Sequence, residues 1–95
     1  MDKRKAYEEK LAAQLEEWNA QVALFRAKAD KATAAAKIEY FELTEELRRK
    51  HDDARTKLHE LKSSTDDAWE ELKTGAEKAW STVQKSFHDA ATKFK

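Results

Sequence analysis

One apolar stripe runs from Tyr7 to Leu61, and it constrains the fold more than any other feature of the sequence. Its positions recur with a mean step of about 3.6 residues, the period of a straight α-helix and not the 3.5 of a strict heptad coiled coil. The residues between them are mostly Glu, Lys, Arg, Gln and Ala, which are strong helix formers. His51 holds the stripe position between Leu47 and Ala54. The stripe therefore predicts one long amphipathic helix over residues 3–62.

The chain has few residues that favour turns. It contains no Pro and one Gly among 95 residues, whereas a fold with many turns normally needs both. The only convincing break is Ser63–Asp67, because side chains of these types compete for backbone hydrogen bonds and favour helix starts. Ser64 followed by Asp67 resembles a capping box. We therefore expect a shorter antiparallel helix over residues 66–94, and the alternative is one unbroken helix through this segment.

The unequal lengths of the two expected helices determine the expected assembly. Folded back on the first helix, the second covers only its C-terminal part, so the N-terminal part of the stripe faces water. A contiguous exposed apolar patch indicates an interface, and an antiparallel homodimer would cover it. The expected interface residues are aromatic and aliphatic: Leu11, Leu15, Trp18, Val22, Phe25, Trp69, Leu72, Trp80, Val83 and Phe87. The alternative is a monomeric three-helix bundle with a break near residues 30–33.

Signatures of catalysis and of metal binding are missing from the sequence. There is no Cys, which excludes disulfides, thiolate ligands and Cys nucleophiles. Di-iron bundles place Glu three residues before a ligating His, but the positions three before His51, His59 and His88 hold Arg48, Thr56 and Lys85. No Gly-rich phosphate loop and no Gly-x-Ser-x-Gly occurs. We expect no enzyme, no catalytic residue, no cofactor and no metal.

The charges of the chain balance, with 19 Lys and Arg against 19 Asp and Glu. A balanced chain has no long-range field that would steer it to nucleic acid, so we expect no nucleic-acid partner. The sequence has neither an apolar segment of the roughly 20 residues that a spanning helix needs nor a secretory signal after its N-terminus. These features predict a cytoplasmic protein with a single helical coiled-coil domain over residues 1–95.

An 11-residue repeat marks the second expected helix. Ala68-Trp69-Glu70-Glu71-Leu72 recurs as Ala79-Trp80-Ser81-Thr82-Val83, and 11 residues correspond to about 3.67 residues per turn over three turns. The repeat places aromatic residues on one face, with Lys73, Lys78 and Lys85 towards its sides. Such a face suits either a protein core or a membrane surface. Two hypotheses follow: a non-catalytic interaction or structural protein, or a peripheral amphipathic protein that binds lipid.

Residues 5–20 (KAYEEKLAAQLEEWNA) and residues 66–80 (DDAWEELKTGAEKAW) resemble a family of small bacterial coiled-coil proteins. Some members of that family are labelled as stress-response proteins. The resemblance covers nearly the whole chain, and it implies a helical, non-catalytic protein with a link to stress. It supplies no catalytic or ligand residues. The 11-residue period alone is also similar to that of apolipoproteins and late-embryogenesis-abundant proteins, which cover lipid or protect other molecules.

Overall fold

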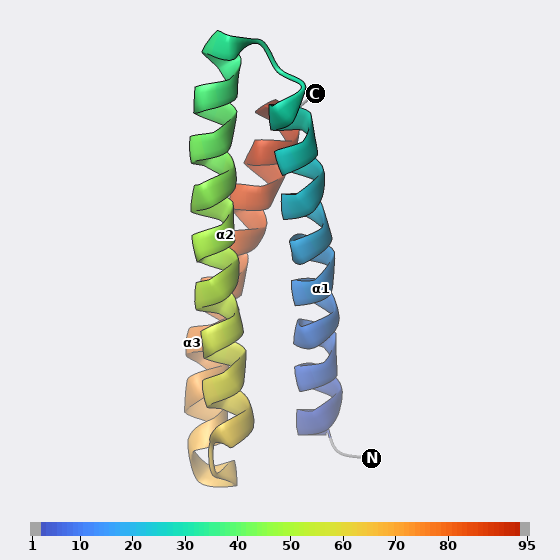
Figure 1. The fold of residues 1–95 in the computed structure, drawn as a ribbon. Coiled ribbons are helices and arrows are strands. Elements are labelled where there is room, and N and C mark those ends of the chain that lie inside the picture. The colour runs from blue at the N-terminus through green and yellow to red at the C-terminus, as the bar shows by residue number, and fades with distance from the viewer. Residues whose placement is uncertain (1–2, 94–95) are drawn as a thin grey trace.

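The chain folds into three α-helices in the computed structural model, which describes residues 3–93 (Figure 1). Helix α1 spans Lys3–Asp30, α2 spans Ala34–Ser63 and α3 spans Asp66–Lys93. No strand occurs among residues 3–93, so the expected all-α fold is confirmed. The expected end of the last helix, at residue 94, lies outside the described residues.

The first turn, at residues 31–33, shows that the continuous helix predicted over residues 3–62 is wrong. Thr33 has extended backbone, with φ −63° and ψ 159°, and its hydroxyl accepts a hydrogen bond from the amide of Ala36 at 3.4 Å. A Thr in this position satisfies one of the amides that the first turn of a helix leaves free. The alternative break near residues 30–33 is the one present, and no positive φ is needed among the described residues to form it.

The second turn lies within the predicted break, but its capping differs from the prediction. The hydroxyl of Thr65, and not that of Ser64, accepts from an amide in the first turn of α3, that of Ala68 at 3.3 Å. Ser64 instead ends α2, and its hydroxyl donates to the carbonyl of Leu61 at 2.7 Å. The capping box predicted at Ser64 is therefore wrong: the cap is Thr65, and Ala68 at the third helical position has no side-chain acceptor to complete a box. An unbroken helix through this segment is also excluded.

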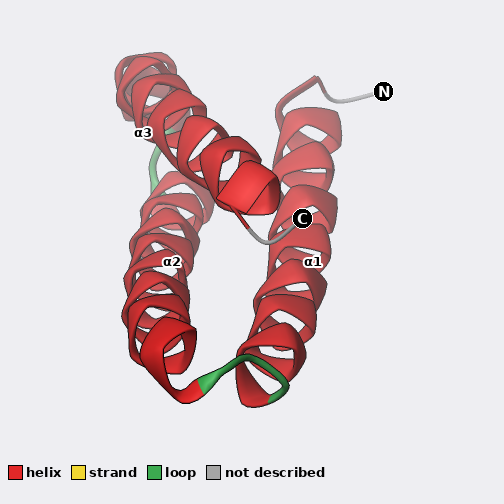
Figure 2. Ribbon diagram, turned by 90° about the horizontal axis from the view of Figure 1, so that it is seen from above, coloured by secondary structure: helices red, strands yellow, loops and turns green. Residues whose placement is uncertain are grey.

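The helices form an elongated bundle of 51 × 20 × 18 Å. Helices α1 and α2 run antiparallel, and α3 crosses them at an angle, so that its C-terminal end returns towards the α1–α2 turn (Figure 2). None of the described helices is both long and apolar enough to cross a bilayer.

The core of the bundle consists of the apolar stripes of all three helices. Nine of the ten residues expected at a subunit interface are buried in it, and Leu72 is the exception at 37% exposed. At its centre, Trp18 stacks on Phe87 with ring centroids 5.4 Å apart and lies 5.4 Å from Trp80. The packing within one chain already covers the stripe, so no second subunit is needed to keep it from water.

His51 is the one histidine in the core. Its Nε2 lies 3.0 Å from the carbonyl oxygen of Leu15, so α2 and α1 are joined by a polar contact midway along the bundle. This contact satisfies a ring nitrogen that burial would otherwise leave without a partner. The apolar stripe tolerates His51 for this reason.

Candidate functional site

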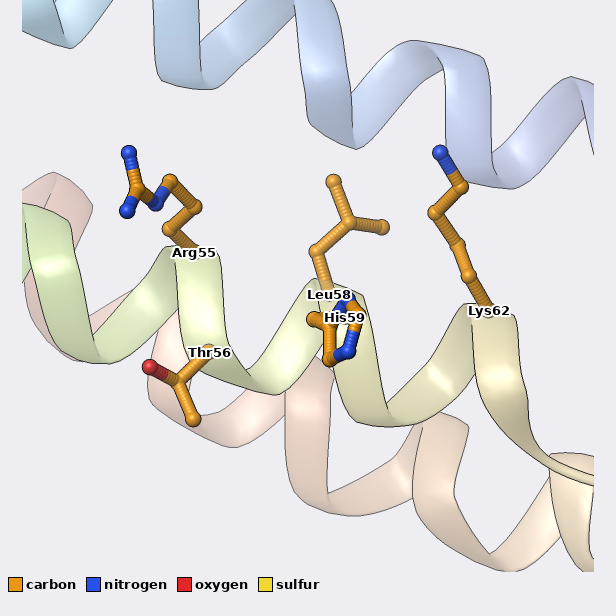
Figure 3. A pocket seen from close by; sticks show the side chains of 5 residues that line it. All are labelled: Arg55, Thr56, Leu58, His59 and Lys62. Atoms are coloured by element: carbon orange, nitrogen blue, oxygen red, sulfur yellow. The ribbon is translucent and has the colours of Figure 1, made fainter.

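A groove beside α2 is lined by side chains of positive and neutral character and has a volume of 480 Å³ (Figure 3). Arg55, His59 and Lys62 follow one another at steps of four and three residues, which places them on one side of the helix. The buried Leu58 lies between them, and Thr56 contributes a hydroxyl. In the close-up, Arg55, Leu58 and Lys62 point towards α1. We call these five residues the cationic groove.

The cationic groove adjoins a smaller hollow of 240 Å³ between α1 and α2. Lys62 lines both, and the α1 side contributes Lys5, Glu8, Glu9 and Ala12. The short side chain of Ala12 leaves space between the helices. The α2 side of this surface is therefore basic, whereas carboxylates lie on the α1 side.

The cations of the groove lack the ion pairs that Arg26 and Arg48 make. Arg26 and Arg48 both contact Glu45 at 2.9 Å. The hydrogen bond from Arg48 and its positive charge lower the pKa of the Glu45 carboxyl. By contrast, neither Arg55 nor Lys62 lies in an ion pair with any residue of 3–93. Their charges are available to an external anion.

The groove offers donors and no carboxylate. A guanidinium and an ammonium recognise carboxylate or phosphate through charge-assisted hydrogen bonds, and the guanidinium can do so in bidentate fashion. From Arg55 to Lys62 the helix rises by about 10 Å, at 1.5 Å per residue. An extended anion or a row of carboxylates matches this spacing better than a single small ion.

A second polar cluster fastens the N-terminal end of α1 to the α2–α3 turn. The Arg4 guanidinium donates to the carbonyl of Ser64 at 2.7 Å, to that of Leu61 at 3.2 Å and to Asp66 at 2.8 Å. Carbonyls at the end of a helix lack partners within it and carry partial negative charge. Arg4 therefore caps α2 from another helix, and it also pairs with Glu8 at 3.1 Å.

Aromatic residues extend this cluster along α3. The indole nitrogen of Trp69 donates to Glu8 at 3.0 Å, and the ring of Trp69 meets that of Tyr7 edge to face at 5.7 Å. The ammonium of Lys73 lies 4.9 Å from the centre of the Tyr7 ring. Burial raises the pKa of the Tyr7 hydroxyl, and the negative charge and hydrogen bond of Glu77 raise it further.

The raised pKa of Tyr7 predicts a measurable change in its titration. In a Tyr40→Phe background, absorbance at the tyrosinate band should report Tyr7 alone, with a midpoint above that of free tyrosine. Because the folded-state pKa is raised, this contribution to stability is present below the ordinary tyrosine pKa and is lost as pH rises through the folded value. Glu77→Gln should lower the midpoint. An unchanged midpoint in Glu77→Gln would show that Glu77 does not act on Tyr7.

Two further hollows lie between α1 and α3, with volumes of 370 and 280 Å³. They share Gln14 and Gln84, and the large rings of Trp18 and Trp80 lie beneath them. The indole nitrogen of Trp80 is buried and has no hydrogen-bond partner among the described residues. Charged residues of both signs line the larger hollow, Lys10 and Glu77, so unlike the cationic groove it does not favour one sign of ligand charge.

None of the ten residues expected at an interface lines the cationic groove. A signal for the groove exists in the sequence, namely basic residues at steps of four and three after Ala54. Basic residues at this spacing are common on solvated helix faces, so the pattern alone does not predict a groove. The sequence pattern likewise does not predict the contacts of Arg4, since its partners lie in a distant segment of the chain.

Comparison with protein-family models, with curated proteins and with solved structures finds no match to this chain. The cationic groove and the helical fold are therefore the basis on which a function is proposed.

Proposed function

We propose that this chain is a non-catalytic helical interaction protein that binds an acidic protein surface through the cationic groove. The observation that carries the proposal is the row of Arg55, His59 and Lys62, which have no ion-pair partner among residues 3–93. A partner helix with carboxylates at steps of three and four would place them at the spacing of this row. The bundle then acts as a rigid scaffold that presents the row.

The proposal also includes a cellular role and a cellular location for the chain. The resemblance to small bacterial coiled-coil proteins supports a non-catalytic role linked to stress, and we include a cytoplasmic location in the same proposal. Both are parts of the proposal and not of the structure. The groove itself supports only the chemistry of the partner, which must supply negative charge.

A binding measurement with a defined probe tests the groove. We expect fluorescein-labelled poly-L-glutamate to bind the protein at low salt, with affinity falling as salt is added because surface charges are screened. Arg55→Glu with Lys62→Glu should weaken binding by on the order of tenfold or more, since like charges then face the probe. The control is Lys78→Glu with Lys85→Glu on α3, which changes the net charge equally and should leave most of the affinity.

Equal losses in the two double variants would show that only net charge matters, and the groove would then not be the binding site. Far-ultraviolet circular dichroism of the unmodified chain is the second check. A largely unfolded chain in dilute buffer would remove the scaffold on which the proposal depends.

A second candidate function is binding to an anionic lipid surface, and exposed apolar residues near the α1–α2 turn favour it. Leu24 is 52% exposed and Ile38 is 67% exposed. Lys28, Lys31 and Lys37 lie in the same part of the chain, and basic residues beside apolar ones suit a bilayer surface.

Vesicles that contain phosphatidylserine provide the probe for this second candidate. Cosedimentation should fall in Leu24→Ser with Ile38→Ser and should be retained in Arg55→Glu with Lys62→Glu. If the lipid opened the bundle, the near-ultraviolet signal of the packed tryptophans would be lost while helicity remained. Absence of binding to both anionic and neutral vesicles would dismiss the lipid function and leave the cationic groove unaffected.

A further inference from the structure

The turn at residues 31–33 contains nothing that forces the chain to bend. It has neither Gly nor Pro, and no described residue outside glycine has a positive φ. Lys31 and Ala32 both favour helix, and their amides still bond to the carbonyls of Lys28 and Ala29, at 3.2 and 3.1 Å. The cap at Thr33 is one side-chain hydrogen bond of 3.4 Å, which is longer than the usual range.

The apolar stripe also keeps its phase across this turn. Ala29, Ala32, Ala36 and Tyr40 follow at steps of three, four and four residues, so a straight helix through the turn would keep one apolar face. The sequence therefore supports both the bent form that the structure shows and a straight form. Exchange of an identical element between two copies is a low-cost route to a dimer, and it needs a connection that can adopt a second conformation.

We propose that α1 exchanges between two copies of this chain. The turn straightens, residues 3–63 become one helix, and α1 of each copy packs on α2 and α3 of the other. The proposal names a second copy as one partner of the chain and so rests on the proposed interaction role.

The exchange remakes every contact that α1 makes in the single chain. Arg4 again caps the α2–α3 turn, Trp18 again stacks on Phe87 and the carbonyl of Leu15 again meets His51, each across two copies. Because the same contacts exist in both forms, their energies cancel. The equilibrium between monomer and exchanged dimer therefore depends on the conformational preference of residues 31–33 and on protein concentration.

The two long helices of the exchanged dimer run antiparallel, since α1 and α2 are antiparallel in the single chain. Each end of the pair receives one α3, which gives three helices in cross-section throughout. The cationic groove is rebuilt from α2 of one copy beside α1 of the other, so exchange does not remove it.

A proline at the start of α2 is compatible with the bent monomer and incompatible with the straight helix of the exchanged dimer. Ala34 is the first residue of α2, a position where proline is favoured, and the extended backbone of Thr33 is the conformation preferred before proline. In a straight helix the same proline would lie in the interior and break it. Ala34→Pro should therefore keep the bent form and lower the dimer association constant by at least about a thousandfold.

Thr33→Ala should have the opposite effect. It removes the cap of the bent form and adds a residue that favours helix, so the dimer association constant should rise by on the order of tenfold. Each protein would be refolded from denaturant at high concentration and its molar mass measured by light scattering behind a sizing column. We expect slowly exchanging monomer and dimer for the unmodified chain, more dimer for Thr33→Ala and only monomer for Ala34→Pro.

Two results would overturn the exchange. One is a monomer at every concentration for both the unmodified chain and Thr33→Ala, and that comparison decides the matter even if Ala34→Pro fails to fold. The other is a dimer fraction that Ala34→Pro leaves unchanged, because the copies would then associate through an outer surface. Either result leaves the binding of poly-L-glutamate at the cationic groove to be judged on its own measurement.

Discussion

Trp18→Ala is expected to lower the free energy of unfolding by about 3–5 kcal/mol, the cost of removing a buried tryptophan from a packed core. Trp18 is 2% exposed. It joins α1 to α3 through its contacts with Phe87 and Trp80, both with ring centroids at 5.4 Å. Aromatic pairs of this kind contribute about 0.5–1.5 kcal/mol beyond the area that they bury. Urea denaturation followed by far-ultraviolet circular dichroism measures the change.

Leu24→Ala is the matched control for Trp18→Ala. Leu24 lies on the same helix but is 52% exposed, so its truncation should change the free energy of unfolding by no more than about 0.5 kcal/mol. Similar losses for the two variants would mean that Trp18 is not covered within the folded chain. The measurement should be made at a concentration where the protein is monomeric, because association would add to the apparent stability.

Leu47→Ala is expected to cost about 2–5 kcal/mol, the second large effect that we predict. Leu47 is 1% exposed, in the middle of α2, and it borders the α2–α3 hollow that also holds Leu43 and Ala90. Truncation would leave a cavity that the three helices can close only by moving together. The loss therefore includes both the transfer of the side chain and the cavity itself.

Leu72→Ala provides the comparison for this second effect. The two leucines have the same chemistry, but Leu72 is 37% exposed, so its truncation should cost clearly less than that of Leu47. The sequence interpretation placed Leu72 and not Leu47 at an interface. A larger loss for Leu72 would contradict the arrangement of α3 in the bundle.

Much of the fold could be predicted from the sequence because apolar residues recur regularly at the helical period. The period of the apolar residues predicted helical structure and the face that is buried. Trp18, Trp80 and Phe87, which were expected at a subunit interface, lie in the core of the single chain. The second turn was also predicted, since Ser63–Asp67 concentrates residues that compete for backbone hydrogen bonds. Its exact cap, Thr65, was missed because neighbouring hydroxyls offer nearly the same interaction.

The first turn could not be predicted from local preference. Lys31 and Ala32 favour helix and the stripe continues through the turn, so only the single cap at Thr33 marks the bend, and the sequence pattern does not reveal it. The hydrogen bonds of Arg4 could not be predicted from local sequence either, because its partners Leu61 and Asp66 lie far along the chain. The cationic groove was missed for a different reason: basic residues at helical spacing are common on solvated faces, and only the folded chain shows that these residues line one hollow.

The distance between the two ends of the α1–α2 hairpin tests the central claim most directly. The chain has no cysteine, so spin labels can be placed at Lys5→Cys and Lys62→Cys, whose side chains line one hollow. The labelled protein would be purified as a monomer and diluted with an excess of unlabelled chain, which removes distances between copies. The bundle predicts a short distance that persists on dilution, since packed helix axes lie about 8–10 Å apart. A distance near the roughly 85 Å of a continuous helix at 1.5 Å per residue would contradict it.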